Sequence, residues 1–287
     1  MIFSLLLLAQ LGFAKINVVV TLPEVAQIAQ SIGGDKVSVR SLLSGLTDPH
    51  YTDAKPSYIL AARDADILCF IGLDLESGWL PKVIEKAANP KIALGAPGHC
   101  DLGKVVDVID KPSGKTSRAE GHFHSQGNPH YNISLLRLTQ VARGLGGILA
   151  KVDSANASHY LQQAQALSKN FEELHQKLKA EVSKGPVLQY HQEFSYFFAD
   201  YGIENLGSLE EKPGLPPSLP RIAAVADLAK KKKVRVLLAN PQAPKASLEK
   251  FSELSGIPYA IVPSYLPQGQ KIEDLQQQII KAIPESL

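Results

Sequence analysis

The chain has 287 residues, of which 45% are hydrophobic, and its formal net charge at pH 7 is +2. This length suits two α/β lobes or one large domain, and the composition is that of an ordinary globular protein. Such a small net charge predicts neither a nucleic-acid-binding surface nor a protein held on a membrane by electrostatics.

Residues 1–14 predict a secretory signal peptide. The apolar run at 1–9 is too short to span a bilayer, and Gly12-Phe13-Ala14 supplies small residues at the −3 and −1 positions of a cleavage site. We therefore expect a mature chain that begins at Lys15, is soluble, and lies in the periplasm or elsewhere outside the cytoplasm. A basic opening segment is missing, and a buried first strand is the alternative. No cysteine lies near the junction, so a lipid anchor there is not expected.

In the first half of the chain, short apolar segments alternate with segments of helical spacing. The alternation predicts a mostly parallel sheet flanked by helices. The predicted strands are 15–21, 36–43, 67–71 and 92–94, and the predicted helices are 22–32, 56–63 and 80–87. The second strand is followed by a loop with the segment Thr47-Asp48-Pro49-His50-Tyr51.

The only two cysteines are Cys69, inside the third predicted strand, and Cys100, in a loop after the fourth. An exported protein could join them in one disulfide, and neighbouring strand ends make this geometrically possible. A buried free thiol at Cys69 is an equally good interpretation, so the sequence leaves the pairing open.

Residues 111–128 are polar and glycine-rich, which predicts a surface loop. This loop contains the pair His122 and His124, and it leads into Gly127-Asn128-Pro129-His130-Tyr131. A helix is then predicted at 134–148, followed by a long amphipathic helix at 156–182 whose apolar stripe includes Tyr160, Leu161 and Ala164.

A second set of alternating segments follows the long helix. Strands are predicted at 187–190, 203–209, 234–239 and 259–262, and helices at 193–201, 220–231, 246–255 and 272–283. The first strand leads directly into His191. The fold class is therefore α/β, and the long helix is predicted to be a rigid spine between two lobes.

Three histidines emerge from stiff or strand-end positions. His50 and His130 each follow a proline that restricts the backbone, and His191 ends a predicted strand. Ligands of parallel sheets bind beyond the carboxyl ends of the strands, where two lobes can bring the three together. Three rigid neutral imidazoles suit Zn²⁺ or a similar divalent ion. Taken singly, each histidine could instead be an ordinary turn residue.

Several segments along the chain carry a family resemblance. They are the 18–21 strand, Asp48-Pro49-His50 with a helix from near Pro56, Ala65-Asp66-Ile67, the histidine loop ahead of Asn128-Pro129-His130-Tyr131, the long helix, His191 to Phe197 with Tyr201-Gly202, and Pro213-Gly214 to Pro217-Ser218. In these segments the chain resembles the zinc/manganese solute-binding proteins of bacterial ABC importers, the cluster A-I family. The likeness covers nearly the whole mature chain, and no single motif carries it.

The resemblance implies two α/β lobes joined by a rigid backbone helix, with a metal ion in the cleft between them. It implies that His50, His130 and His191 are the metal ligands and that the ion is passed to the membrane permease of an ABC importer. The corresponding division is a signal peptide at 1–14, an N-terminal lobe at 15–153, a connecting helix at 154–183 and a C-terminal lobe at 184–287. The expected partners are the metal ion and the permease, with no nucleic acid, and a monomer is expected.

The chain departs from the family where many members supply a carboxylate ligand after the last strand. Here the segment Val262-Pro263-Ser264-Tyr265-Leu266-Pro267-Gln268 has no acidic residue. The fourth ligand could be water, Gln242, Gln268 or a loop residue. Without a carboxylate the ligand set is neutral, which favours zinc over manganese or iron.

Two other functions stay open at the level of sequence. One is hydrolysis, because a three-histidine zinc site with an open position can activate water. The only base near the histidines in sequence is Glu193, and we expect its side chain to point away from the site. No enzymatic activity is therefore predicted. The second function left open is that of an extracellular adhesion protein with this fold. The histidine loop, by resemblance to longer loops of zinc-binding members, is expected to capture metal weakly through His122 and His124, or to do nothing.

Overall fold

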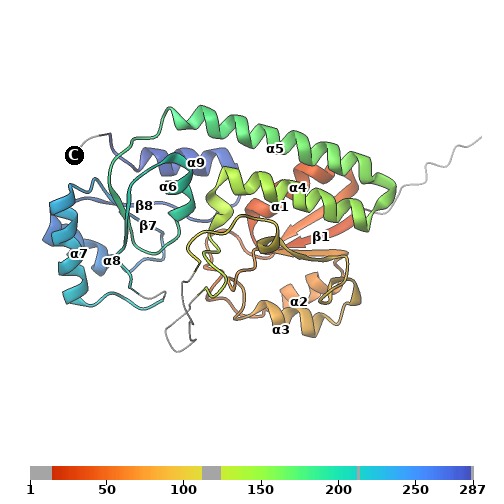
Figure 1. The fold of residues 1–287 in the computed structure, drawn as a ribbon. Helices are drawn as coiled ribbons and strands as arrows, with labels where there is room; N and C mark the ends of the chain where they lie inside the picture. Colours follow the sequence, from red (N-terminus) through yellow and green to blue (C-terminus); the bar gives the residue numbers. More distant parts are fainter. Residues whose placement is uncertain (1–14, 112–123, 212–213, 286–287) are drawn as a thin grey trace, which may run out of the picture.

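Two lobes lie side by side, joined by helices that run across the top of both in Figure 1. The structure is a computed structural model, and it describes residues 15–111, 124–211 and 214–285. The predicted signal peptide at 1–14 and His122 lie outside the described residues. Within the described part of the chain, no helix is both long and apolar enough to cross a membrane.

The first lobe is built on a parallel sheet of the order β2-β1-β3-β4. Valines at 18–20 give the central strand its β propensity and are buried. The strands are β1 (Ile16–Val20), β2 (Val37–Ser41), β3 (Ile67–Phe70) and β4 (His99–Asp101), and the flanking helices are α1 (Pro23–Gly33), α2 (Pro56–Arg63) and α3 (Leu80–Ala87). Each of these helices has proline in its first turn, where a missing N–H costs no hydrogen bond.

The fourth strand differs from the prediction, which was wrong in placing it at 92–94. Residues Pro90–Ile92 form a 3₁₀ turn, capped by the side chain of Asn89, which accepts a hydrogen bond from Lys91 N at 3.0 Å. Ile92 is buried by this turn, so its apolar character reflects packing and not strand pairing. The strand lies at His99–Asp101, and Cys100 therefore sits in register beside Cys69 of β3.

Cys69 and Cys100 form a disulfide, with their Cα atoms 4.4 Å apart. Both side chains are fully buried in the core of the first lobe. The sequence left open whether the two cysteines are paired, and the structure shows that they are.

The second lobe repeats the same topology, with a parallel sheet of the order β6-β5-β7-β8. Its strands are β5 (Val187–Gln189), β6 (Asn205–Ser208), β7 (Leu237–Ala239) and β8 (Tyr259–Ile261), and its helices are α6 (Ser195–Tyr201), α7 (Leu219–Lys232), α8 (Lys245–Ser255) and α9 (Ile272–Lys281). The chain leaves β5 to pair first on one side with β6 and then on the other with β7. The carboxyl end of β5 is therefore the switch point where such sheets bind ligands.

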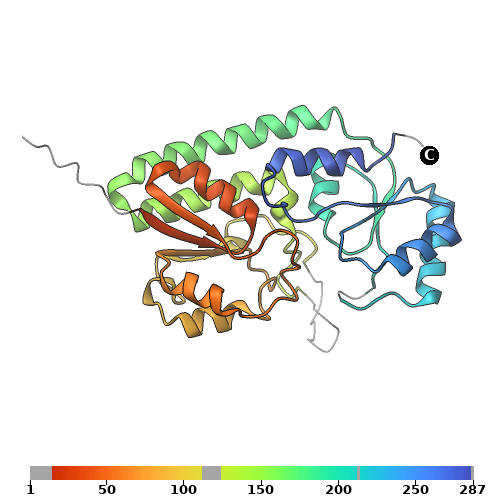
Figure 2. The ribbon, with the colours of Figure 1, turned by 180° about the vertical axis from the view of Figure 1, so that it is seen from behind.

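Two helices, α4 (Leu135–Val152) and α5 (Ala157–Lys179), follow the first sheet along the chain, and α5 leads into the second. Helix α5 packs along α4 and α1 and extends from the first lobe towards the second (Figure 1), and the view from behind shows α9 beneath it (Figure 2). The buried face of α5 includes Tyr160, Ala164, Phe171 and Leu178. The prediction that Leu161 shares this face was wrong, because one residue of helix turns it about 100° away and leaves it 52% exposed.

The larger hydrophobic core is shared between the lobes. It runs from the valines of β1 through α4 and α5 to the aromatic residues of α6 and the apolar face of α9. A separate, smaller core lies among β5, β7, α7 and α8. The packing of α6 and α9 in this shared core fixes the second sheet relative to the first lobe, and with it the carboxyl end of β5, which His191 follows.

Candidate metal centre

The loop after β2 fixes the direction of His50 through the preceding aspartate. One oxygen of Asp48, Oδ1, accepts hydrogen bonds from the backbone N of His50 at 2.9 Å and from its ring Nδ1 at 2.7 Å. The Pro49 carbonyl between them accepts a 2.8 Å bond from the buried Trp79 indole N–H. Proline geometry and these bonds together hold the ring with Nε2 turned away from Asp48.

The second proline segment repeats this turn. Asn128 Oδ1 accepts from the backbone N of His130 at 2.9 Å, and Asn128 Nδ2 donates to Gln192 O at 2.8 Å. His130 is 1% exposed, and its Nδ1 lies 3.3 Å from the Tyr265 hydroxyl. Tyr265 belongs to the segment in which the family commonly places an acidic ligand.

His191 comes from the second lobe, two residues beyond the end of β5. Its Nδ1 lies 2.6 Å from Glu210 Oε2, and the other oxygen of Glu210 accepts from Gly214 N at 2.8 Å. Glu210 is itself 7% exposed, so this carboxylate is held between the ligand and the neighbouring loop.

His124 enters the same space from the histidine loop. A turn closed by Gly127 N donating to His124 O, at 3.1 Å, carries it. Its Nε2 lies 3.1 Å from the Nε2 of His50.

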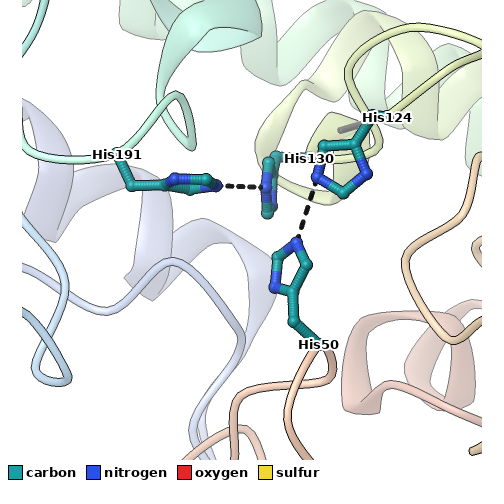
Figure 3. A group of neighbouring side chains, drawn as sticks. All are labelled: His50, His124, His130 and His191. Atoms are coloured by element: carbon teal, nitrogen blue, oxygen red, sulfur yellow. Dashed lines mark hydrogen bonds between the residues drawn. The ribbon is translucent and has the colours of Figure 1, made fainter. Parts of the chain in front are cut away.

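The four imidazoles converge, as Figure 3 shows. His130 Nε2 lies 3.1 Å from His191 Nε2, and one ring nitrogen from each of His50, His124, His130 and His191 falls within 4.8 Å of every other. A tetrahedral Zn²⁺ with bonds of about 2.0–2.1 Å holds its ligand atoms about 3.3 Å apart. The spacing of these nitrogens therefore fits one small divalent ion at their centre.

The surroundings prepare the nitrogens for a cation. A carboxylate beside Nδ1 accepts a hydrogen bond from the Nδ1–H group, so the neutral rings of His50 and His191 each present a lone pair at Nε2. Burial, and then the neighbouring imidazoles, hold the pKa of His130 well below its usual value. Burial acts in the same sense on His191, but the hydrogen bond to Glu210 and the charges of the nearby carboxylates together outweigh it and raise the pKa of His191. Burial opposes the effect of His50 on Asp48, yet the bond from His50 still lowers the pKa of Asp48.

The three histidines that the sequence singled out are thus brought together, and His124 joins them. A loop residue was among the sequence's candidates for the fourth ligand, and the structure brings His124 of that loop into the cluster. Of the other candidates for a fourth ligand, Gln242 donates to Leu46 O at 3.0 Å across the lobes, and Gln268 lines a separate pocket beside Pro23 and Ser41.

Glu193 corrects another expectation, because it does not point away from the site. It lines the same cavity of about 350 Å³ as His50 and His191, is 2% exposed, and accepts a hydrogen bond from the Asn240 amide. Burial raises the pKa of Glu193 to about 7. The chain bends at Gln192 before α6, and alternation along β5 therefore no longer sets its direction.

The residues behind the ligands were only partly visible in the sequence. Asp48 could be found from its place in Asp-Pro-His, as could Asn128. Glu210 and Tyr265 carried no local signal, because β-sheet pairing and the segment after β8 bring them to the site.

Comparison with known proteins gives a family-level match. Residues 18–283 match the family model described as the periplasmic zinc-uptake complex component A. The zinc-binding lipoprotein AdcA of Streptococcus pneumoniae is 25% identical over 256 residues, which cover 85% of this chain and 48% of AdcA. The metal ABC transporter substrate-binding lipoprotein SloC of Streptococcus mutans is 25% identical over 257 residues, 86% of this chain and 79% of SloC. The chain thus spans about half the length of AdcA and most of SloC.

Solved structures share the fold. The crystal structure of ZnuA has a TM-score of 0.75 and 21% identity, covering 94% of this chain and 100% of that chain. The binding protein FpvC of Pseudomonas aeruginosa, solved with Mn²⁺, has a TM-score of 0.72 and 20% identity, covering 94% and 98%. These likenesses and the two parallel sheets confirm the predicted two-lobed α/β fold.

Proposed function

This chain belongs to the family of periplasmic zinc-uptake components, and from that premise we propose that it captures Zn²⁺ between its lobes and delivers it to the permease of an ABC importer. The observation that carries the proposal is the convergence of four imidazole nitrogens within 4.8 Å of one another. Two relatives support it, since AdcA is a zinc-binding lipoprotein and SloC is a metal ABC transporter substrate-binding lipoprotein.

The donor set favours zinc over manganese and iron. Four neutral imidazoles suit a borderline ion such as Zn²⁺, whereas Mn²⁺ prefers hard oxygen ligands. Glu193 and Glu210 lie at the same cavity, but their carboxylates are engaged by Asn240, His191 and Gly214. A manganese or iron receptor is the alternative, and FpvC shows that a protein of this fold can hold Mn²⁺.

Binding, and not catalysis, is the role that the geometry supports. A catalytic zinc keeps one position open for water, whereas structural and storage sites close all four. Here His124 Nε2 lies where an open position would be, 3.1 Å from His50 Nε2. Glu193, the only base considered for a hydrolase, accepts from Asn240.

The proposed division of the chain explains capture and release. With lobes at 15–153 and 184–287 and a connecting helix at 154–183, the first lobe supplies His50, His124 and His130, and the second supplies His191 alone. Separation of the lobes would remove one ligand of four, so opening at the permease lowers the affinity. We propose that the chain acts as a monomer.

Alanine substitution with isothermal titration calorimetry tests the function. His50→Ala, His130→Ala and His191→Ala should each weaken Zn²⁺ binding by at least about 100-fold, because a tetrahedral site loses a ligand. His159→Ala is the matched control, since His159 lies on α5 and is not a member of the cluster. Parent-like affinity in all three site variants would contradict the proposal. Tighter binding of Mn²⁺ than of Zn²⁺ by the parent would favour the alternative metal.

A further inference from the structure

His124 differs in sequence from His50 and His130, because Phe123 stands before it where those two histidines each follow a proline. Its neighbour Ser125 donates two hydrogen bonds to a single oxygen of Asp74, Oδ2, from the backbone N at 3.1 Å and from Oγ at 2.7 Å. Gly127 N closes the turn by donating to His124 O at 3.1 Å. We call the contact between Asp74 and Ser125 the clasp.

The chain is also fixed just beyond this turn. Asn128 N donates to Ile109 O at 3.0 Å, and Asn128 Nδ2 donates to Asp110 Oδ2 at 3.0 Å. The chain is therefore anchored at two places that follow His124, one at Ser125 and one at Asn128. Only the anchor at Ser125 is adjacent to the imidazole, so it has the larger influence on where Nε2 lies.

Asp74 is presented by an unusual backbone turn. Gly72, Leu73 and Asp74 have φ values of 75°, 52° and 69°, a left-handed run in which only glycine is comfortable. Such conformations persist where the surroundings hold them, and they concentrate at functional sites.

The buried carboxylate of Glu76 does the holding. It accepts from Ile71 N at 2.9 Å, from Gly72 N at 3.1 Å and from Thr21 Oγ1 at 2.7 Å. Ser77 Oγ donates to Asp74 O at 2.9 Å and closes the other side of the turn. These hydrogen bonds hold the shape of the turn that follows β3, and the turn presents the half-buried Asp74 carboxylate to Ser125.

We propose that Asp74 is a positioning residue for the metal site, which holds Ser125 so that His124 Nε2 reaches the ion as the fourth ligand. This inference rests on the proposed function and adds a mechanism to it. Both partners of the clasp belong to the first lobe, so the lobes can separate without breaking it. The ion would then leave His191 first and stay with the three ligands of the first lobe until the last step of transfer.

The substitution Asp74→Gly isolates the clasp, because glycine accepts φ of 69° without strain and removes only the carboxylate. Ser125→Ala removes one of the two bonds, and Asp74→Asn tolerates the left-handed turn while keeping a neutral acceptor. Lys233→Gly is the matched control, since Lys233 has φ of 54° at the end of α7 in the second lobe. Each variant is compared with His124→Ala and with the double variant Asp74→Gly/His124→Ala.

The measurements are Zn²⁺ affinity by competition with a chromogenic chelator and the visible spectrum of the Co²⁺-loaded protein, which reports the number of nitrogen ligands. We expect Asp74→Gly to weaken zinc binding about 10- to 100-fold, as His124→Ala does, and to change the Co²⁺ spectrum in the same way. The double variant should lose no more than either single variant, and Asp74→Asn should recover part of the loss. Melting temperatures of Asp74→Gly and Lys233→Gly should not fall below the parent's.

Three results would overturn the inference. One is an Asp74→Gly variant with parent-like affinity and spectrum beside a weakened His124→Ala. Another is a parent-like His124→Ala, which would leave the site with His50, His130 and His191 and the proposed function intact. Additive losses in the double variant would show that Asp74 acts on something other than His124. A parent that fails to bind zinc would instead remove the proposed function, and the clasp with it.

Discussion

At the scale of single residues, two Asx turns place two of the ligands. Asp48 and Asn128 each accept the backbone N–H of the histidine two residues later, both at 2.9 Å. The proline between them restricts the turn further. Each of these turns is formed by consecutive residues, which is why His50 and His130 could be predicted as ligands from the sequence. The second ring nitrogen of His50 also has a local partner in Asp48, whereas those of His130 and His191 contact Tyr265 and Glu210, which lie too far along the chain to be predicted.

The partner of His191 gives a prediction about ligand support. Glu210→Gln should weaken zinc binding about 10- to 100-fold, because a neutral amide replaces the carboxylate that holds the His191 ring and enriches its Nε2. Calorimetry measures the change, and Glu211→Gln, at the exposed neighbouring position, is the control. Equal losses in the two variants would show that the effect is general charge and not the contact with His191.

Protons should compete with the metal at the same nitrogens. An imidazolium cannot bind Zn²⁺, so affinity should fall as pH drops through about 6.5 and below. The fall should begin at His191, whose pKa is raised by Glu210, since the pKa of His130 is lowered by its burial. Titration between pH 8 and 5.5 in buffers of different ionisation enthalpy would show proton release on binding. An affinity that does not vary with pH would point to ligands other than imidazole.

At the scale of elements, the sequence predicted best those helices whose ends carry a chemical signal. Helices α2 and α3 match their predicted bounds, and both begin at or next to a proline. The prediction of the fourth strand of the first sheet was wrong. Ile92 and Leu94 suggested a strand that pairs with the sheet, but the turn capped by Asn89 prevents that pairing. Strand β4 has only three residues and polar ends, so only its neighbour β3 identifies it.

The disulfide between β3 and β4 should be a large part of the stability of the first lobe. Closing a loop of 31 residues contributes about 3–4 kcal/mol in the chain-entropy view. The variant Cys69→Ala/Cys100→Ala should therefore melt on the order of 10 °C below the oxidised parent. Parent refolded under reducing conditions is the control, because it keeps both sulfur atoms and lacks only the bond. If the reduced parent melts at the same temperature as the oxidised parent, the disulfide does not contribute to stability, and the lower melting temperature of the variant is a packing effect.

At the scale of the whole molecule, a buried polar network ties the two lobes together beside the site. Glu24 Oε1, at the start of α1, accepts from Asn132 Nδ2 at 2.8 Å and from Leu266 N at 2.7 Å. Asn132 Nδ2 also donates to Ser264 O at 2.7 Å. These contacts span more than 100 residues of sequence, so no local pattern could have predicted them. They hold the segment that carries Tyr265 against the back of His130.

This network should make stability depend on pH through Glu24. Burial is the main cause that raises the pKa of Glu24 to about 7 from a usual value of 4.5. The folded state therefore holds a proton that the unfolded state releases, and the resulting stability, complete below about pH 4.5, is lost as pH rises through 7. Metal-free Glu24→Gln cannot ionise and should match the parent at pH 5, yet be more stable at pH 8 by up to about 3 kcal/mol.

Thermal denaturation of metal-free protein at pH 5 and 8 measures this difference, with Glu85→Gln on the exposed face of α3 as the control. Glutamine keeps the Oε1 acceptor for Asn132 and Leu266, so the interlobe contacts survive the change. A Glu24→Gln variant that is destabilised equally at both pH values would show that the carboxylate is charged in the folded protein and is needed as such. A gain at pH 8 alone would show instead that Glu24 joins the lobes as a neutral acid.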